Sequence, residues 1–550
     1  MSTANQLADD LLEVMLDVFP IGASLLGLPG RDDQMRDYSE AGDAAIRDRA
    51  LAIAARARAL DPAGLSDDDQ LTLGVVVQQA QSVVDTVDLR STEYAITDTW
   101  TAPAAALLVQ LPMVGLTDAT RADGYLARLA KLPEAFAQIA QRHRDGVAAG
   151  RRPVRHLVDG AVAHLDRYLA NAAGDPLRKP APAEDNGFAA ERDRLIDEVV
   201  RPAVAVYRDV LATEIAPASR GLEEAGLCFL PGGDELYRRQ VRLHTTTDRT
   251  PDELHRIGLD LIAGLAAEFA EIGAEAFGTS DTAAVLHRLR TDPALRWGGG
   301  EEILDAARDA IERAEKAAPE WFGTLPAQRC TVAPVPADEA PGAPAAYYLA
   351  PAIDGSRPGI YFANTSQPGD RDRTVAEATA FHEAVPGHHL QISLAQELTG
   401  LPLLRRIAQF TAYGEGWGLY AERLADEMGL YSSPIARLGM LATDSMRAAR
   451  LVVDTGIHAK GWSRQQVVDY LRANTAMAEV EIQSETDRYI ADPGQALAYM
   501  VGRLEIQRLR EQARATMGDR FDIRAFHDTV LTSGPLPLGT LAERVRRWAG

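Results

Sequence analysis

The sequence predicts a mainly α-helical globular protein in which β-structure is a minor component. Long segments carry apolar residues at three- and four-residue spacing, which is the pattern of an amphipathic helix. These segments are residues 7–19, 44–60, 67–87, 121–149, 153–173, 189–216 and 250–277. The hydrophobic fraction of 46% and the charged fraction of 25% are typical of a folded globular chain.

Helix starts and breaks are also marked in the sequence. Ser66 is followed by three aspartates, which predicts a helix N-terminus because acids favour the positive end of the helix dipole. Residues 171–186 contain three prolines and mixed charges, which indicates a surface connection. Trp297 precedes three glycines and two glutamates. A phosphate-binding loop would need Lys and Ser or Thr there, so this run predicts a helix start instead.

Residues 329–372 differ from the rest of the chain, because they are rich in proline and glycine and contain short β-like runs. The runs at 346–349 (AYYL) and 359–363 (GIYFA) predict two or three strands of a small antiparallel sheet immediately before the next helix. The second run could lie beside an extended ligand as an edge strand, or it could form a packing hairpin. Both interpretations stay open.

At 550 residues the chain is longer than one ordinary hydrophobic core supports. We expect an N-terminal helical part (residues 1–175), a helical middle part (176–328) and a third part (329–550). The third part holds the small sheet, the residues with metal-binding chemistry and the C-terminal helices. One continuous unit over the whole chain is the alternative.

Bulk properties argue against several classes of partner. The net charge of -22 is spread along the chain without a Lys/Arg block, so nucleic acid and anionic membranes are not expected partners. No stretch reaches the roughly 18 apolar residues of a membrane span, and residues 1–16 lack the basic region of a signal peptide. Cys228 and Cys330 alone provide no disulfide framework and no thiolate zinc cluster. We therefore expect a cytoplasmic protein, with homodimer formation left open.

The segment at 374–391, TVAEATAFHEAVPGHHLQ, carries the most informative chemistry. A helix that bears His-Glu supplies a metal ligand, His382, and a neighbouring carboxylate, Glu383, that can act as general base. Zinc suits imidazole and carboxylate ligands and leaves one position open for water, although other divalent metals also fit. The sequence therefore predicts a zinc site with His382 as first ligand and Glu383 as catalytic base.

The second histidine does not follow the ordinary spacing. Position i+4 from His382 is Pro386, while His388 at i+6 would face another side of a straight helix. His389 at i+7 returns to the same face but lies about 10 Å along the axis. Pro386 and Gly387 can distort the helix, and a two-residue bulge would bring His388 to the ligand position. We expect His388 as the second ligand, with His389 as the alternative.

A third ligand is expected from a second helix over residues 403–428, which contains YGEGWGLYAE. Glu415 and Glu422 are seven residues apart and point to one side of this helix, two turns from each other. Only one of them can comfortably reach the metal, and Glu415 sits among glycines that permit close helix approach. We predict Glu415 as the ligand and Glu422 as a residue that hydrogen-bonds a ligand or a buried arginine.

Further groups could complete a hydrolytic site, because an oxyanion needs a Tyr, His or Arg donor. His458 follows Asp454 by four residues, so Asp454 could orient its imidazole. Tyr489 and Tyr499 flank a turn at 492–495, and we expect His458 and Tyr499 as catalytic residues. A substrate carboxylate favours a bidentate arginine, and the candidates are Arg447, Arg450, Arg488 and Arg503. Each of these groups could instead form a structural ion pair or a core hydrogen bond.

Four segments together, HEAVPGHHLQ, EGWGLYAE, RLVVDTGIH and PGQALAYMVGRLEI, resemble the bacterial domain-of-unknown-function family 885 over nearly the whole chain. That family in turn resembles carboxypeptidase Taq and, more distantly, thermolysin-like gluzincin peptidases. The resemblance implies a large helical, metallocarboxypeptidase-like body with a deep cleft and a small sheet at the cleft edge. It also implies a glutamate ligand from the next long helix, which matches Glu415. The related peptidases carry an uninterrupted HExxH, whereas this chain has two more residues between its histidines.

These observations predict a zinc-dependent metallopeptidase that hydrolyses short peptides as a carboxypeptidase or oligopeptidase. The expected ligands are one Zn²⁺ ion and a short peptide or small amide substrate. Two alternatives are a metal-dependent hydrolase of another small amide or ester, and a catalytically inactive peptidase fold that binds a ligand. Elemental analysis separates the last alternative from the others, because it predicts no bound metal.

Overall fold

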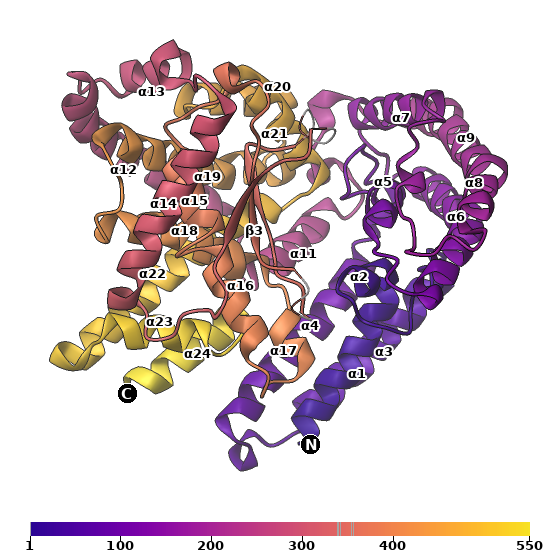
Figure 1. Ribbon diagram of the computed structural model, residues 1–550, viewed down its shortest axis with the longest axis horizontal. Coiled ribbons are helices and arrows are strands. Elements are labelled where there is room, and N and C mark those ends of the chain that lie inside the picture. Colours follow the sequence, from indigo (N-terminus) through magenta and orange to yellow (C-terminus); the bar gives the residue numbers. More distant parts are fainter. Residues whose placement is uncertain (1, 338–339, 341–342, 354, 356) are drawn as a thin grey trace.

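The computed structural model describes residues 2–337, 340, 343–353, 355 and 357–550. The described chain is mainly helical and contains one small sheet, which confirms the predicted fold class (Figure 1). Short 3-10 turns link many of the longer elements. They are η1 (Pro62–Gly64), η2 (Ser91–Glu93), η3 (Leu111–Met113), η4 (Pro176–Arg178), η7 (Leu222–Glu224), η8 (Leu227–Phe229), η9 (Pro293–Leu295), η10 (Pro368–Asp370), η11 (Gln495–Leu497) and η12 (Gly518–Arg520).

Helices α1 to α10 form the N-terminal part of the chain. They are α1 (Thr3–Val18), α2 (Pro20–Leu25), α3 (Glu40–Arg58), α4 (Asp67–Asp88), α5 (Pro103–Gln110), α6 (Ala119–Ala148), α7 (Arg155–Ala170), α8 (Phe188–Leu195), α9 (Arg201–Val210) and α10 (Ala216–Ala218). Two π-helical turns, η5 (Ile196–Val200) and η6 (Leu211–Ile215), connect α8, α9 and α10 directly. The side chain of Ser66 accepts a hydrogen bond from the backbone N–H of Asp69, so the predicted helix start is confirmed.

Helices α11 to α24 form the rest of the helical structure. They are α11 (Gly233–Thr245), α12 (Pro251–Phe277), α13 (Thr282–Thr291), α14 (Gly300–Trp321), α15 (Ala376–Glu383), α16 (His388–Glu397), α17 (Leu403–Ile407), α18 (Thr411–Glu427), α19 (Pro434–Ala459), α20 (Arg464–Asn474), α21 (Glu479–Ala491), α22 (Ala498–Met517), α23 (Ile523–Leu531) and α24 (Leu538–Ala549). Helix α14 begins at Gly300, as the glycine run predicts. The helix predicted over residues 403–428 is interrupted at residues 408–410 and forms α17 and α18.

The sheet contains β1 (Thr331–Pro334), β2 (Ala346–Leu349) and β3 (Ile360–Ala363), in the order β1-β3-β2. Strand β3 pairs antiparallel with β2 but parallel with β1. The prediction of an antiparallel sheet is therefore wrong for β1, because β3 inserts between two strands that run in opposite directions. The same order places β3 in the centre, so it cannot be the ligand-binding edge strand considered above. Strand β2 is an edge strand of the described sheet.

Buried hydrophobic side chains of the described residues form three clusters. The largest joins α1, α3 and α4 with helices of the C-terminal half, including α15, α18, α22 and α24, so the two ends of the chain share one core. A second cluster belongs to α5 through α10, and a third joins α19, α20 and α21. The division into parts at residues 175 and 328 stays a prediction.

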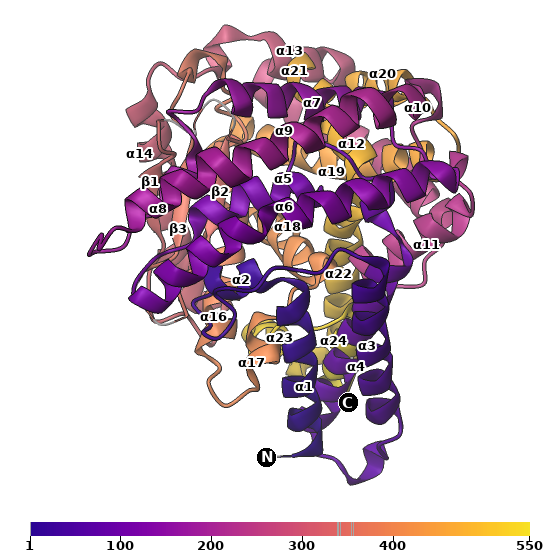
Figure 2. The same ribbon diagram turned by 90° about the vertical axis from the view of Figure 1, so that its right-hand side faces the viewer.

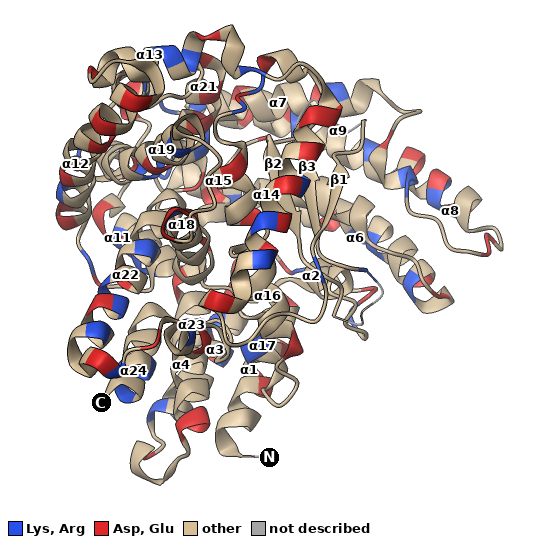
Figure 3. Cartoon of the chain, turned by 60° about the vertical axis from the view of Figure 1, so that its left-hand side comes forward, with Lys and Arg blue, Asp and Glu red and all other residues tan. Residues whose placement is uncertain are grey.

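The helices of the second cluster form a layer against the rest of the molecule. In Figure 2, α6, α7 and α9 cross in front of α18 and α19. Acidic and basic residues alternate along many of the visible helices (Figure 3), which agrees with a dispersed surface charge. None of the helices in the described part of the chain is long and apolar enough to cross a membrane.

Candidate metal centre

His382 lies on α15, and its imidazole is fixed from both sides by glutamates of α18. The residue is only 4% exposed. Its Nδ1 is 2.8 Å from Oε1 of Glu422, and its Nε2 is 3.4 Å from Oε2 of Glu415. A carboxylate accepts hydrogen bonds only, so Nδ1 carries the proton donated to Glu422. This arrangement leaves the Nε2 lone pair for a metal, as in the carboxylate–histidine pairs of zinc sites.

The chain between the two candidate histidines leaves the helical conformation. Helix α15 ends at Glu383 and α16 begins at His388, and the Val385–Pro386 peptide bond is cis. The expectation of a bulge within one continuous helix is therefore wrong, since two separate helices flank a four-residue break. The indole N–H of Trp417 on α18 donates to the carbonyl of Pro386 at 2.9 Å, which ties the break to α18.

This break brings His388 back to His382. The two imidazole rings are 4.7 Å apart between centroids and perpendicular to each other. Nε2 of His388 is 3.5 Å from Oε2 of Glu415. Ligand atoms of His382, His388 and Glu415 all lie within 4.8 Å of one another. The structure thus brings together the three residues that the sequence predicts as metal ligands.

Three glycines allow this close approach. A Cβ at Gly387 would lie 1.9 Å from the carbonyl oxygen of His382, and a Cβ at Gly418 would lie 2.6 Å from Cε1 of the same residue. Gly416 packs against the backbone of Gly502 on α22, where a Cβ would lie 2.4 Å from Cα of Gly502. Larger residues at these positions would separate α15, α16, α18 and α22, so the predicted role of the glycines around Glu415 is supported.

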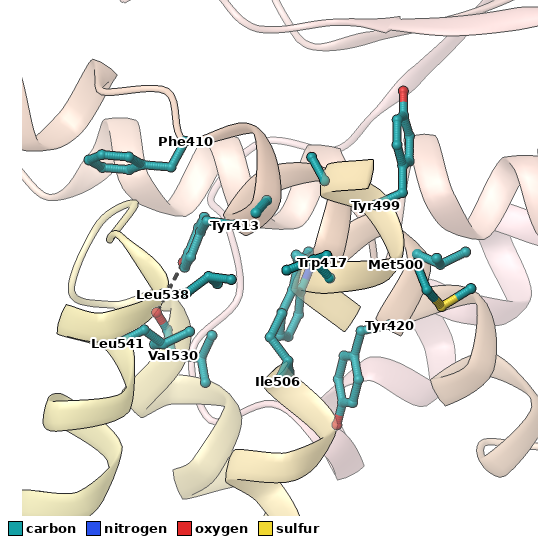
Figure 4. Packing of buried hydrophobic residues seen from close by; sticks show 14 of the residues in the cluster. Phe410, Tyr413, Trp417, Tyr420, Tyr499, Met500, Ile506, Val530, Leu538 and Leu541 are labelled. Atoms are coloured by element: carbon teal, nitrogen blue, oxygen red, sulfur yellow. Dashed lines mark hydrogen bonds between the residues drawn. The ribbon is translucent and has the colours of Figure 1, made fainter. Parts of the chain in front are cut away.

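The aromatic residues of α18 anchor the helix in the core. Figure 4 shows Tyr413, Trp417 and Tyr420 pointing into the buried cluster, with the Tyr413 hydroxyl bonded to the carbonyl of Val530 at 3.0 Å. The hydroxyl of Tyr499 on α22 points away from these three side chains (Figure 4). Because the apolar face of α18 is fixed in this way, Glu415 is held on the opposite side toward α15.

The electrostatics of the cluster favour a positive charge between the ligand atoms. Burial alone would lower the pKa of His382, whereas hydrogen bonds with Glu415 and Glu422 raise it to about 10. Burial alone would raise the pKa of Glu415, but hydrogen bonds from His382 and His388 hold that pKa well below its usual range. A proton or a metal cation at this position is therefore stabilised by the surrounding carboxylates.

A cavity of 720 Å³ opens beside the ligand atoms. His382, Glu383, His388 and Glu415 all line it, as do side chains of β2 and α22. Residues of the N-terminal part of the chain also line it, including Trp100, which is 64% exposed. The candidate centre is therefore accessible to a ligand of peptide size, and the predicted base Glu383 lies on the same wall.

His389, the alternative ligand, serves a structural role instead. Its Nε2 donates to the carbonyl oxygen of Gln328 at 2.9 Å, so Nδ1 accepts from the Tyr348 hydroxyl, also at 2.9 Å. The residue is completely buried, and burial lowers its pKa. Both ring nitrogens are engaged within the protein, which leaves His388 as the second candidate ligand and ties α16 to the sheet.

Glu422 lies where the sequence predicts, next to a ligand. Its Oε1 contacts His382, and its Oε2 accepts from the Thr443 hydroxyl of α19 at 2.6 Å. The Tyr431 hydroxyl donates to the backbone carbonyl of Glu422 at 3.0 Å. These contacts fix the carboxylate at 2% exposure, so Glu422 orients His382 and cannot itself reach the cavity.

His458 does not join the site, and the predicted pairing with Asp454 is wrong. The backbone N–H of Leu227 donates to Nδ1 of His458, and Nε2 donates to the Tyr489 carbonyl at 2.8 Å. Burial lowers the pKa of His458 to about 3, so the imidazole stays neutral. Asp454 instead accepts from the Tyr237 hydroxyl and the Gly494 N–H. A completely buried imidazole with both nitrogens occupied cannot transfer a proton to substrate.

The remaining predicted residues divide between the cavity and the core. Tyr499 lines the cavity, and its ring stacks 6.5 Å from that of His382. Arg450 donates to the Tyr489 hydroxyl at 2.9 Å and to Glu485 at 2.7 Å. Of the other three candidate arginines, Arg488 donates to Gln495 and Arg503 is ion-paired with Asp444, whereas Arg447 lines the cavity. We therefore interpret Arg450, Tyr489 and Arg503 as structural residues.

Sequence reasoning missed residues that hold the helices of the site in place. Thr443, Tyr348 and the indole of Trp417 reach the site from positions far apart in the chain. The tryptophan between two glycines was the one local signal, because a large buried ring with an N–H donor requires an acceptor. The hydroxyl groups carried no signal, since hydroxyl residues are common in helices and strands.

Comparisons with known proteins place the chain in a family. The family described as "Bacterial protein of unknown function (DUF885)" matches residues 20–545. The crystal structure of a "putative lipoprotein" from Colwellia psychrerythraea has a TM-score of 0.89 at 27% identity, covering 100% of this chain and 99% of that one. A "putative lipoprotein of unknown function" from Shewanella oneidensis has a TM-score of 0.78 at 18% identity, covers 99% of both chains and shows the fold alone. The curated proteins contain no match. The chain therefore belongs to this family of bacterial proteins of unknown function.

Proposed function

We propose that the protein is a zinc-dependent metallopeptidase that hydrolyses short peptides, as a carboxypeptidase or an oligopeptidase. One observation carries the proposal. Two imidazole nitrogens and a carboxylate oxygen converge within 4.8 Å on the wall of a 720 Å³ cavity, with Glu383 on the same wall. His₂Glu is a ligand set of catalytic zinc, with a position left for water.

Two of the three distances between the ligand atoms support a metal of this size. Three ligands of a tetrahedral zinc ion with bonds of about 2.1 Å lie about 3.4 Å from one another. Oε2 of Glu415 is 3.4 Å from Nε2 of His382 and 3.5 Å from Nε2 of His388. When bound there, the ion would polarise a carbonyl group and lower the pKa of water.

The chain's own side chains have separate tasks in this proposal. Glu383 takes a proton from the attacking water and passes it to the leaving amine, as a general base and then a general acid. Glu422 holds the Nδ1 proton of His382 and so keeps Nε2 available as a ligand. The Tyr499 hydroxyl has no hydrogen-bond partner in the described part of the chain, so it is available to donate to the oxyanion.

The surroundings of the site support an extended peptide as substrate. Strand β2 is an edge strand, and its Tyr347 and Tyr348 line the cavity beside the ligand atoms. An extended peptide can pair with such an edge through main-chain hydrogen bonds. A likeness of this site to carboxypeptidase Taq and the gluzincins is part of the proposal.

The cellular location is a separate part of the proposal. The sequence favours a cytoplasmic protein without nucleic-acid partners. The structural relative at 27% identity, however, is described as a putative lipoprotein, which makes an exported protein the alternative. Fractionation of cells that produce the full-length protein distinguishes the two.

Elemental analysis and turnover measurements test the proposal together. We expect about one zinc ion per chain, and loss of peptide hydrolysis after chelation. Glu383→Gln should retain the metal and lose turnover, because the amide cannot accept the proton. The exposed Glu511→Gln on α22 is the control and should retain both. Absence of bound metal would favour the inactive binding protein, and full turnover in Glu383→Gln would refute the base role.

A further inference from the structure

We infer that Arg447 binds the free C-terminal carboxylate of the substrate and so makes the protein a carboxypeptidase. The identity of the substrate rests on the proposed function. The anion site itself rests on the surroundings of Arg447 alone. Among the described residues, Arg447 itself forms no hydrogen bond, ion pair or ring contact with His382, His388 or Glu415, so the two proposals can be tested separately.

The position of Arg447 on α19 is the first observation. From Leu438 to His458 this helix is buried on all sides, except at Met446 and Arg447, which are half-buried. Arg447 lines the same cavity as His382 and Glu383. The guanidinium group is therefore the part of α19 that faces the cavity.

The charge of Arg447 is not neutralised by the protein. Within the described chain, no carboxylate lies within ion-pair distance of its guanidinium, and Glu481 on α21 interacts with it only over a longer distance. Its Nη1 contacts the sulfur of Met446 at 3.4 Å, and its buried Nε has no hydrogen-bond partner. Sulfur is a weak acceptor, and unsatisfied buried donors of a charged group are unfavourable. A carboxylate from outside the chain would satisfy them.

The neighbouring arginines differ from Arg447 because each lies beside a carboxylate of the protein. Arg450 and Arg488 both lie beside Glu485, at 2.7 Å and 3.6 Å, and Arg503 is paired with Asp444. Besides Arg447, the cavity wall carries Arg406, whose Nε and Nη2 donate to the carbonyl of Gln396 at 3.1 Å and 2.6 Å. Of the arginines that the sequence offers for a substrate carboxylate, Arg447 therefore has the most unused binding capacity.

The distance from Arg447 to the metal centre suits a chain end. Cζ of Arg447 lies 4.9 Å from the centre of the Tyr499 ring, and this ring stacks 6.5 Å from the ring of His382. One aromatic ring thus separates the guanidinium from the first ligand. One to three extended residues span roughly 3 to 10 Å, so a peptide cleaved near its C-terminus can reach both groups.

Tyr499 supports the same assignment. Its ring lies against the guanidinium groups of Arg447 and Arg450, which restrains both side chains through cation–π contacts. Its hydroxyl points away from the buried cluster (Figure 4) and toward the cavity that it lines. A carboxylate at Arg447 would therefore bind beside a fixed aromatic wall, where the planar guanidinium can form paired hydrogen bonds.

The test compares peptides that end in a free carboxylate with the same peptides amidated at the C-terminus. We expect the wild-type protein to prefer the acid in kcat/KM. In Arg447→Gln the ratio of acid to amide should fall roughly 10- to 100-fold, because charge-assisted hydrogen bonds are lost. Arg447→Lys should recover part of the ratio, since the charge remains but the planar fork does not. Arg406→Gln removes a cation from the same cavity wall and should keep the wild-type ratio.

A binding measurement separates this inference from the proposed function. Calorimetry with an N-acetylated dipeptide and its C-terminal amide requires no turnover. If no peptide is hydrolysed but the acid binds better and Arg447→Gln removes this preference, the anion site stands and the proposed function fails. If peptides are hydrolysed and the ratio is unchanged in Arg447→Gln and Arg447→Lys, the function stands and the inference is overturned. Equal binding of acid and amide to the wild-type protein would also overturn it.

Discussion

Gly418→Ala tests the packing of α18 against the metal helix with the smallest available change. A Cβ at Gly418 would lie 2.6 Å from Cε1 and 2.7 Å from Nε2 of His382, whereas ordinary contact begins near 3.4 Å. The imidazole would have to retreat by roughly 0.8 Å, which exceeds the tolerance of about 0.2 Å in metal-ligand distances. Gly418→Ala should therefore weaken zinc binding by at least tenfold, because the displaced atom is the predicted ligand.

Gly414→Ala provides a matched control on the same helix. Gly414 directly precedes Glu415, and a Cβ there meets no atom within 4 Å. Both substitutions improve helix propensity, which is worth up to about 1 kcal/mol. Gly414→Ala should gain this stability and keep its zinc affinity. In Gly418→Ala this gain in stability should be cancelled by overpacking, which typically costs about 1 to 3 kcal/mol.

Two measurements on these variants test the predicted changes in zinc affinity and in stability. Competition with a chelating dye gives the zinc affinity, and urea unfolding of the metal-free proteins gives the free energy of unfolding. Wild-type zinc affinity in Gly418→Ala would refute the reasoning, because the ring would then have room to move without leaving the metal. Equal weakening in both variants would also contradict it, since a loss of glycine flexibility rather than a clash would explain the result.

Two further predictions concern buried carboxylates. Glu422→Gln keeps the shape of the side chain but removes the charge that holds the Nδ1 proton of His382, so zinc affinity should fall about 10- to 100-fold in the same competition assay; an unchanged affinity would contradict this role. Burial raises the pKa of Asp454 to about 7, despite hydrogen bonds from Tyr237 and Gly494. The folded state therefore retains a proton that the unfolded chain releases above about pH 4, so the free energy of unfolding should decrease by up to about 4 kcal/mol as pH rises from 4 to 7. In urea unfolding, the free energy of unfolding of Asp454→Asn should not show this decrease with pH. The same pH dependence in Asp454→Asn and in the wild-type protein would contradict the prediction.

Much of the helical structure follows from local pattern. The amphipathic segments and the cap at Ser66 were sufficient to locate helices such as α4, α6 and α12, because burial of one face and satisfaction of terminal N–H groups are local requirements. The direction of β1 was not predictable in this way. Its partner β3 lies about 30 residues further along the chain, and β2 intervenes in sequence but not in space. Pairing of this kind depends on how the chain between the strands is placed.

The candidate ligands were predictable because their chemistry is rare and close in sequence. His382 and His388 are separated by a proline and a glycine, which can redirect the backbone, and Glu415 lies among glycines. The exact form of the break was not predictable. The break is fixed by Trp417, on a different helix, whose indole N–H donates a hydrogen bond to the carbonyl of Pro386. Such a contact depends on the packing of α18 against α15 and not on any local preference.

The prediction that Asp454 orients His458 was wrong because this part of α19 is buried. The same burial is the basis for the inference about Arg447. Residues four apart lie on the same face of a helix, but their side chains need not pair when neighbouring elements cover that face, and this part of α19 is enclosed by neighbours. A buried polar side chain must then bond to whichever neighbouring element faces it, so Asp454 bonds to α11 and His458 bonds to backbone from residues 227 and 489. Arg447 lies where α19 meets the cavity instead, and its Nε has no such partner. We therefore base the proposed ligand site on the unpaired Nε of Arg447 at the cavity, and not on the sequence spacing of Asp454 and His458.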